Sequence, residues 1–220
     1  MKIRRILIGI ALFTLAVTAS PLSAPRLLAF PYVLRVGADM VYSTVPLRPA
    51  TLGPILARAD RLVHASPLAS GAEGREIFLT GGGWRWNWLA GTSAGAFALT
   101  RPFSTSVIVN RADLARDHVY NEAAMGGTRS LSGVIAHEKC HGMVRRHFGA
   151  LRERMAPAWL REGYCDYIAG GSSLTDAQAD ALETAGRYHP AIAYVRGRQK
   201  VAAMLATNGG SVDALFAKAQ

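Results

Sequence analysis

The stretch VIAHEKCHGMV, residues 134–144, places two histidines four residues apart, with a glutamate directly after the first. On an α-helix, residues four apart lie on one face, about 6 Å from one another along the axis. His137 and His141 can therefore offer two imidazoles to one metal ion, and Glu138 lies beside them. A catalytic zinc site has three protein ligands and one open position. The remaining chain must then supply a third ligand.

A second segment, APAWLREGYCDYIAGG (residues 156–171), offers that ligand. Pro157 suits a first helical turn and the two final glycines suit a stop, so the pattern predicts a helix over 157–169. Glu162 lies in the middle of this helix, and Asp166 lies one turn beyond it on the same face. A carboxylate at Asp166 can accept the outer N–H of a ligating histidine and fix its tautomer.

HEKCH, followed after twenty intervening residues by WLREGYCDY, resembles the gluzincin branch of zinc metallopeptidases, which includes thermolysin and the large aminopeptidases. The resemblance covers less than a quarter of the chain and is typical of small exported members. It implies that His137, His141 and Glu162 bind zinc, that Glu138 is the catalytic general base, and that Asp166 supports the first histidine. It also implies a zincin-like fold and a peptide or protein substrate.

The mechanism that the resemblance implies is metal-assisted hydrolysis of peptide bonds. Zinc would activate a water, and Glu138 would take the proton of that water and pass it to the leaving amine. The active-site cleft is expected between a strand half and a helical half, and a strand edge, FALTR (97–101) or TSVIVN (105–110), could bind an extended peptide. No motif identifies the oxyanion-stabilising residue, for which the candidates are Tyr188, His189 and Tyr194.

The length and composition of the chain limit the number of domains that it can form. The chain has 220 residues, 50% hydrophobic and 18% charged, which suits one core and a single domain over 25–220. Three basic residues precede an apolar run, 6–19, that is shorter than the ~20 residues of a spanning helix. This pattern predicts that residues 1–24 are a signal peptide or an N-terminal membrane anchor. We therefore expect an exported protein, periplasmic or otherwise extracytoplasmic, or one held at the membrane.

The net charge of +10 favours contact with anionic surfaces. From it we expect association with an anionic membrane surface, although a basic protein with no such partner is an equal alternative. No nucleic-acid motif is present, so we expect no nucleic-acid partner.

The periodicity of the chain predicts an α+β fold, with a small N-terminal sheet followed by a mostly helical half. Trp84, Trp86 and Trp88 alternate with polar residues, which suits a strand with three indoles on one face, as a core face or as an interfacial platform. Thr175 and Gln178 form a capping box. Further strands are predicted at 32–36, 76–80, 97–99 and 106–109, and helices at 51–65 (capped by Thr51), 113–124, 131–148, 157–169, 176–185, 190–206 and 212–219.

Two other motifs compete with this interpretation. His147 lies six residues after His141, where metzincins place a third histidine, but Val144 stands where those proteins need a glycine, so we expect His147 on the surface. GTSAG (91–95) fits the serine motif of patatin-like lipases. No hydrophobic strand leads into Ser93, however, so a small-residue turn is the better interpretation.

Gly163 is unfavourable in a helix by ~1 kcal/mol relative to alanine, which suits a place where another backbone, a metal or a substrate comes close. Cys140 and Cys165 could form a disulfide if their helices cross, pack as small buried residues, or have a metal-touching or redox role. Two functional classes also remain: a zinc peptidase, and a non-catalytic envelope protein that uses the metal site for structure or for peptide binding. Replacement of Glu138 by glutamine separates these classes.

Overall fold

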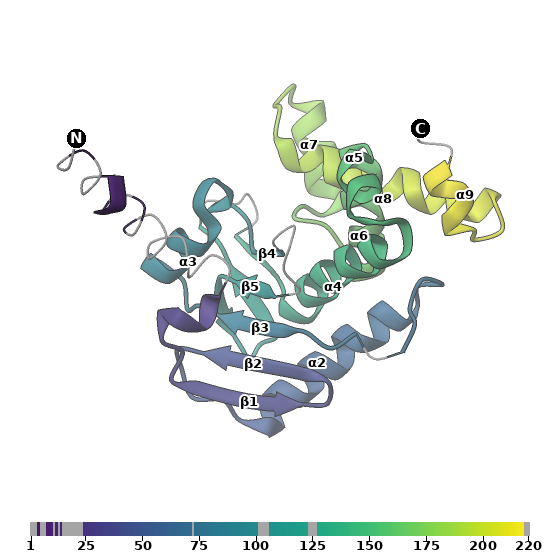
Figure 1. The fold of residues 1–220 in the computed structure, drawn as a ribbon. Helices are drawn as coiled ribbons and strands as arrows, with labels where there is room; N and C mark the ends of the chain where they lie inside the picture. The colour runs from purple at the N-terminus through teal and green to yellow at the C-terminus, as the bar shows by residue number, and fades with distance from the viewer. Residues whose placement is uncertain are drawn as a thin grey trace.

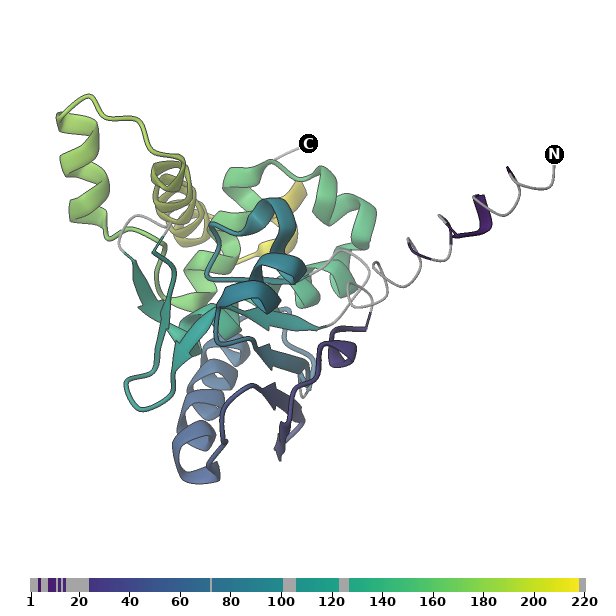
Figure 2. The same cartoon turned by 90° about the vertical axis from the view of Figure 1, so that its left-hand side faces the viewer.

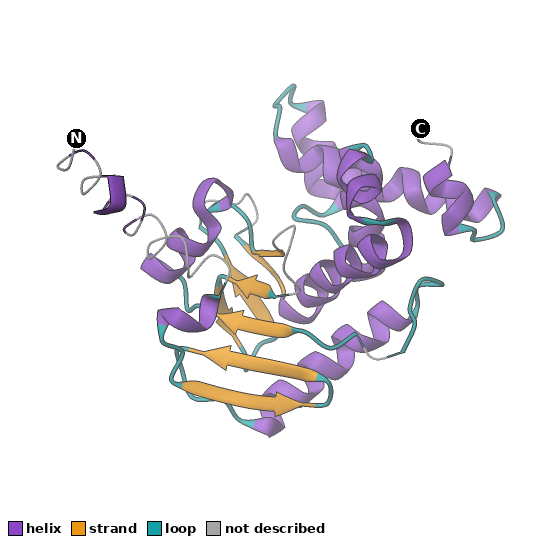
Figure 3. Cartoon of the chain, viewed as in Figure 1, coloured by secondary structure: helices purple, strands orange, loops and turns teal. Residues whose placement is uncertain are grey.

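The computed structural model describes residues 24–71, 73–100, 106–122 and 127–217, with isolated positions at Arg4, 8–10, Leu12 and Thr14. The predicted leader falls, apart from these isolated positions and Ala24, outside the described residues. Among the helices of the described chain, none combines the length and apolarity that crossing a membrane requires. The fold is α+β, with a mixed sheet, a second small sheet and a helical half (Figures 1 and 3).

The main sheet has the strand order β1-β2-β3-β5-β4. Its three inner strands run parallel, whereas the two edge strands, β1 and β4, are antiparallel to their neighbours. β4 is short and ends the sheet on the side of the helical half (Figure 1). The strands are β1 (Tyr32–Val36), β2 (Asp39–Ser43), β3 (Glu76–Leu79), β4 (Ala98–Thr100) and β5 (Val107–Val109).

Both faces of the sheet are covered, because alternate side chains of its inner strands enter two different cores. One core joins Val41, Ile77 and Val107 to helices α2 (Pro49–His64) and α4 (Leu131–Phe148). The other core joins the intervening residues Tyr42, Phe78 and Ile108 to the 3-10 turn η1 (Pro25–Leu28) and helix α3 (Gly83–Ala90). The buried strands therefore hold α4 firmly against one face of the sheet, with α3 on the other (Figure 2).

The predicted helix over 113–124 is wrong over its described part, 113–122, which includes a hairpin of the second sheet; residues 123 and 124 lie outside the described residues. The strands β6 (Arg111–Asp113), β7 (His118–Tyr120) and β8 (Thr128–Ser130) pair antiparallel. Asp113 Oδ1 accepts hydrogen bonds from the backbone N–H groups of Ala115 and Arg116, which closes a turn in place of a helix. Asp117 then adopts a φ of +53°, which ends any helical continuation.

The predicted strand through the three tryptophans is also wrong. Three successive glycines, residues 81–83, have φ values of 71°, 78° and 64°, and they turn the chain after β3 into helix α3. On a helix, alternate residues point to opposite sides. Trp86 is therefore 3% exposed in the core, while Trp84 and Trp88 lie on the outer face, 58% and 44% exposed.

The helical half largely follows the predicted order. α4 spans the predicted residues, and the Thr175–Gln178 capping box at the start of α7 is confirmed. α2 begins at Pro49 after Arg48, so Thr51 does not cap it. The further helices are α5 (Ala150–Met155), which was not predicted, α6 (Ala158–Ala169), α7 (Asp176–Thr184), α8 (Pro190–Thr207) and α9 (Val212–Ala217).

Gly163 lies where α6 crosses α8 with the backbones almost in contact. A Cβ atom on Gly163 would lie 2.4 Å from the carbonyl carbon of Gly197, and one on Gly197 would lie 2.5 Å from the carbonyl oxygen of Trp159. Another backbone is therefore the reason for this glycine, one of the three explanations that the sequence allowed. The contact holds α6, and Glu162 with it, close to α8.

Candidate metal centre

Helix α4 places the two histidines and Glu138 on the side of the helical half that faces strand β4 across a cavity. Its first turn is held by the hairpin before it: Ser130 Oγ accepts from Gly133 N, and Asp117 Oδ1 accepts from Ser132 N at 2.7 Å. A negative charge at the N-terminus of a helix also interacts favourably with the helix dipole. The hairpin that replaces the predicted helix thus anchors the start of the helix that carries the site.

His137, His141 and Glu162 form a nearly equilateral triangle of ligand atoms. The two Nε2 atoms are 3.2 Å apart, and each lies 3.4 Å from Glu162 Oε2. A tetrahedral zinc ion with bonds of 2.0–2.1 Å has ligand atoms about 3.3–3.4 Å from one another. The three side chains therefore fit one face of a tetrahedron, and together they form a group that could hold a metal ion.

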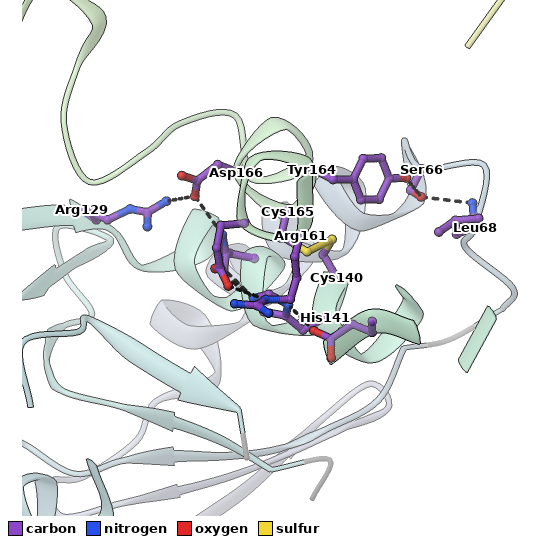
Figure 4. The surroundings of a disulfide bond; sticks show 12 residues. Ser66, Leu68, Arg129, Cys140, His141, Arg161, Tyr164, Cys165 and Asp166 are labelled. Atoms are coloured by element: carbon purple, nitrogen blue, oxygen red, sulfur yellow. Dashed lines mark hydrogen bonds and ion pairs between the residues drawn. A yellow bond between two sulfur atoms is a disulfide. The ribbon is translucent and has the colours of Figure 1, made fainter. Parts of the chain in front are cut away.

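Each histidine also contacts a carboxylate through its other ring nitrogen. His137 Nδ1 lies 2.8 Å from Oδ1 of Asp166, the carboxylate that the sequence offered for such a contact. His141 Nδ1 lies 3.2 Å from Glu153 Oε1 on α5, a contact that sequence reasoning missed because the short helix α5 was not foreseen. Arg129 Nη2 in turn donates to Asp166 Oδ1 at 3.1 Å (Figure 4). Such outer contacts orient the imidazoles and raise their basicity.

These charges decide how the site is protonated in the metal-free state. Burial would lower the pKa of His137, but Asp166 and Glu162 outweigh it and raise that pKa. Burial would also lower the pKa of His141, but Glu153 and Glu162 raise it to about 10. Burial would raise the pKa of Glu162, yet the two histidines hold it well below its usual range. Glu162 is therefore a carboxylate next to imidazolium groups, whose protons a divalent cation would displace.

A disulfide ties the two ligand helices together. Cys140 on α4 is bonded to Cys165 on α6, and both are fully buried. Cys140 directly precedes His141, and Cys165 directly precedes Asp166, so the bond lies beside the metal group (Figure 4). Of the three roles considered for the cysteines, the structure selects the disulfide.

A cavity of about 1130 Å³ opens over the triangle. Glu138 and the triad line it, together with β4 on one side and α5 and α6 on the other, so it lies between the strand half and the helical half. Within the described residues, no hydrogen bond or ion pair engages the Glu138 carboxylate. Arg161 Nε donates to Glu162 Oε1 at 2.9 Å and leaves Oε2 directed to the two histidines.

The three candidates for an oxyanion-stabilising residue differ in position. Tyr194 on α8 lines the cavity, whereas Tyr188 is 89% exposed outside it. His189 accepts a hydrogen bond from the backbone of Ala191 at the start of α8. Burial and the negative charge of Glu162 raise the pKa of Tyr194, so its hydroxyl keeps its proton and is a hydrogen-bond donor. Of the three, only Tyr194 lines this cavity.

The two competing motifs are not brought into a catalytic arrangement. His147 Nε2 contacts Asp213 on α9 at 2.8 Å, on the surface as expected, and it does not belong to the metal group. Ser93 ends a 3-10 turn, η2 (Gly91–Ser93), which follows helix α3 and not a strand. A nucleophile elbow needs a strand leading into the serine, so the serine-hydrolase interpretation has no support.

No family model, curated protein or solved structure matches this chain. The structure itself shows an α+β fold and a His137–His141–Glu162 group that could hold a metal ion. The metal and the reaction are matters of proposal.

Proposed function

We propose that this chain is an exported, zinc-dependent peptidase of the gluzincin type, with a zincin-like fold. The observation that carries the proposal is the triangle of His137, His141 and Glu162, whose sides match a zinc tetrahedron. Beside it, in an open cavity, lies the Glu138 carboxylate, which no described residue engages in a hydrogen bond or ion pair. The disulfide supports export, because such bonds persist in oxidising compartments. Residues 1–24 are the proposed leader or membrane anchor.

The residues of the site have distinct roles in this proposal. When bound, zinc supplies a Lewis acid that polarises the scissile carbonyl and lowers the pKa of a water. Glu138 accepts the proton of that water and delivers it to the leaving amine. Tyr194 donates a hydrogen bond to the carbonyl oxygen of the substrate as negative charge develops there. Edge strand β4, which lines the cavity, pairs with an extended peptide.

Metal content and peptide hydrolysis together test this function. Purified protein, loaded with zinc and freed of excess metal, should hold one zinc per chain and cleave members of a random peptide library, and a chelator should abolish both. Glu138→Gln should keep the zinc and lose cleavage. His141→Gln should lose the zinc, whereas the matched variant His147→Gln, altered on the exposed side of the same helix, should keep it.

The outcomes separate the two functional classes. A protein that binds zinc and peptides but cleaves none, and that is indifferent to Glu138→Gln, would be a non-catalytic envelope protein with a structural or peptide-binding metal site. A protein in which His141→Gln and His147→Gln hold the same amount of zinc would have no metal centre at this place.

A further inference from the structure

The charges that line the cavity fall into two groups. Every acidic side chain on its wall belongs to the metal centre: Glu138 is the proposed base, Glu162 a ligand, and Glu153 and Asp166 contact the histidines. Apart from His137 and His141, the other charged side chains that the described residues place on this wall are arginines. They come from four different elements: Arg129 on β8, Arg145 on α4, Arg154 on α5 and Arg161 on α6.

Two of these arginines are engaged by the site itself. Arg129 donates to Asp166 Oδ1 and to the backbone oxygen of Gly171 at 2.8 Å, and Arg161 donates to Glu162 Oε1. These two arginines therefore orient the carboxylates of the metal centre, and their positive charges are partly neutralised there.

Arg154 is placed differently. Its side chain is exposed, and within the described parts of the chain it makes no hydrogen bond or ion pair. It lines the cavity over the metal group, and the residue before it, Glu153, contacts His141. Arg145 lies one helical turn beyond His141 and lines the same wall. A substrate held over the metal centre therefore lies in a cavity that Arg145 of α4 and Arg154 of α5 help to line.

The guanidinium group recognises carboxylates through two parallel hydrogen bonds, with a geometry that lysine or a neutral donor does not reproduce. The surplus of +10 over the chain also attracts anionic ligands toward the cavity. In contrast, a cationic substrate residue at this wall would meet like charges.

We propose that Arg154, with Arg145, binds a carboxylate of the substrate, so that the cavity selects peptides that place a carboxylate at this wall. The inference rests on the peptidase function proposed above. The carboxylate belongs either to an aspartate or glutamate side chain close to the cleaved bond or to the C-terminus of the peptide. Both sources offer the same chemistry to Arg154, and the experiment must distinguish them.

The test uses zinc-loaded protein and matched peptides. Three peptides share one sequence that the library digest shows to be cleaved: one with glutamate near the cleaved bond, one with glutamine there, and one with glutamate and an amidated C-terminus. We expect kcat/KM to be about 10- to 100-fold higher for glutamate than for glutamine, as for a hydrogen bond to a charged group. Loss of activity on amidation alone would assign the carboxylate to the C-terminus.

Two variants of Arg154 test whether this residue causes the preference for a carboxylate. Arg154→Gln should bring the glutamate-to-glutamine ratio close to one, and Arg154→Glu should favour a lysine-containing peptide. The control is Arg35→Gln, since Arg35 is exposed on β1 and does not line the cavity. This control should keep the wild-type ratio. Equal kcat/KM of the wild-type protein for the glutamate, glutamine and amidated peptides, or an unchanged carboxylate preference in Arg154→Gln, would overturn the proposal.

A binding measurement keeps the inference separate from catalysis. The fluorescence anisotropy of labelled peptides should show the same preference for the acidic member with zinc-loaded Glu138→Gln protein, which cannot turn over the peptide. Acid-selective binding that depends on Arg154, without cleavage by the wild-type protein, would uphold the recognition and refute the peptidase. Cleavage without any preference for a carboxylate would refute the recognition and leave the peptidase intact.

Discussion

The disulfide between α4 and α6 yields a stability prediction that can be worked from the structure. Cys140 and Cys165 are separated by 25 residues, so their bond closes a loop of about that length. In the chain-entropy account, the cross-link removes about 12 cal/mol/K from the unfolded ensemble, or about 3.5 kcal/mol at 25 °C. We therefore expect the double variant Cys140→Ala/Cys165→Ala to unfold with a free energy about 3.5 kcal/mol lower than that of the oxidised protein.

Alanine is the appropriate replacement, because both cysteines are fully buried and a serine hydroxyl would be left in an apolar place. Urea unfolding of metal-free protein, followed by tryptophan fluorescence, gives the free energies. In a chain of this size the melting temperature should fall by about 7–14 °C. Reduced wild-type protein is the matched reference: it retains both sulfurs and should resemble the double variant if the cross-link, and not packing, is responsible.

Two results would refute this reasoning. A loss smaller than about 1 kcal/mol would mean that the cross-link does not limit the unfolded chain as the entropy account requires. Titration of two free thiols in the unreduced, unfolded protein would mean that the bond between α4 and α6 does not form at all.

Three further predictions concern packing, a buried charge and the protons of the site. Gly163→Ala should destabilise the protein by about 1–3 kcal/mol despite the helix preference of alanine, because the new methyl group meets the backbone of α8. The control Gly171→Ala adds a methyl group in open space and should change the urea midpoint little. Lys139→Met should lower the free energy of unfolding by about 3–5 kcal/mol at pH 7, because Lys139 Nζ lies 2.7 Å from the buried Asp39 carboxylate and its loss leaves that charge unpaired. Burial raises the pKa of Asp39, so this loss should shrink as the pH is lowered and the carboxyl takes up its proton. A loss that does not change with pH would contradict the assignment. Zinc binding at pH 7 should release at least one proton, because the pKa of His141 is raised to about 10 and a ligand must be neutral. Calorimetry in buffers of different ionisation enthalpy counts the released protons. The affinity should fall at least tenfold per pH unit as the pH is lowered below about 10.

The metal group was predictable because its signal is local. His137 and His141 owe their position to helical spacing alone, and the predicted helix has the predicted ends. Glu162 and Asp166 were predictable because they lie on a second helix, whose two ends are marked in the sequence by a proline and by glycines. That helix then had only to contact the first. Glu153 has no such signal, since α5 is a single short helix whose placement depends on how the chain turns at Gly149.

The sequence-based predictions of secondary structure were wrong where local hydrogen bonds or glycine conformations outweigh the periodicity of the hydrophobic residues. Asp113 and Asp117 turn a helical pattern into a hairpin, and three glycines with positive φ convert an alternating tryptophan pattern into the start of α3. Neither effect shows in hydrophobic spacing. The disulfide was likewise one of several options from sequence, because the crossing of α4 and α6 that brings the two sulfurs together is a tertiary feature.

The most direct test of the central claim is anomalous diffraction at the zinc absorption edge from crystals of the zinc-loaded protein. We predict one strong anomalous peak per chain, within about 2.0–2.2 Å of His137 Nε2, His141 Nε2 and a carboxylate oxygen of Glu162. A peak at another place, or a Glu162 side chain directed away from an ion held by the two histidines, would contradict the account.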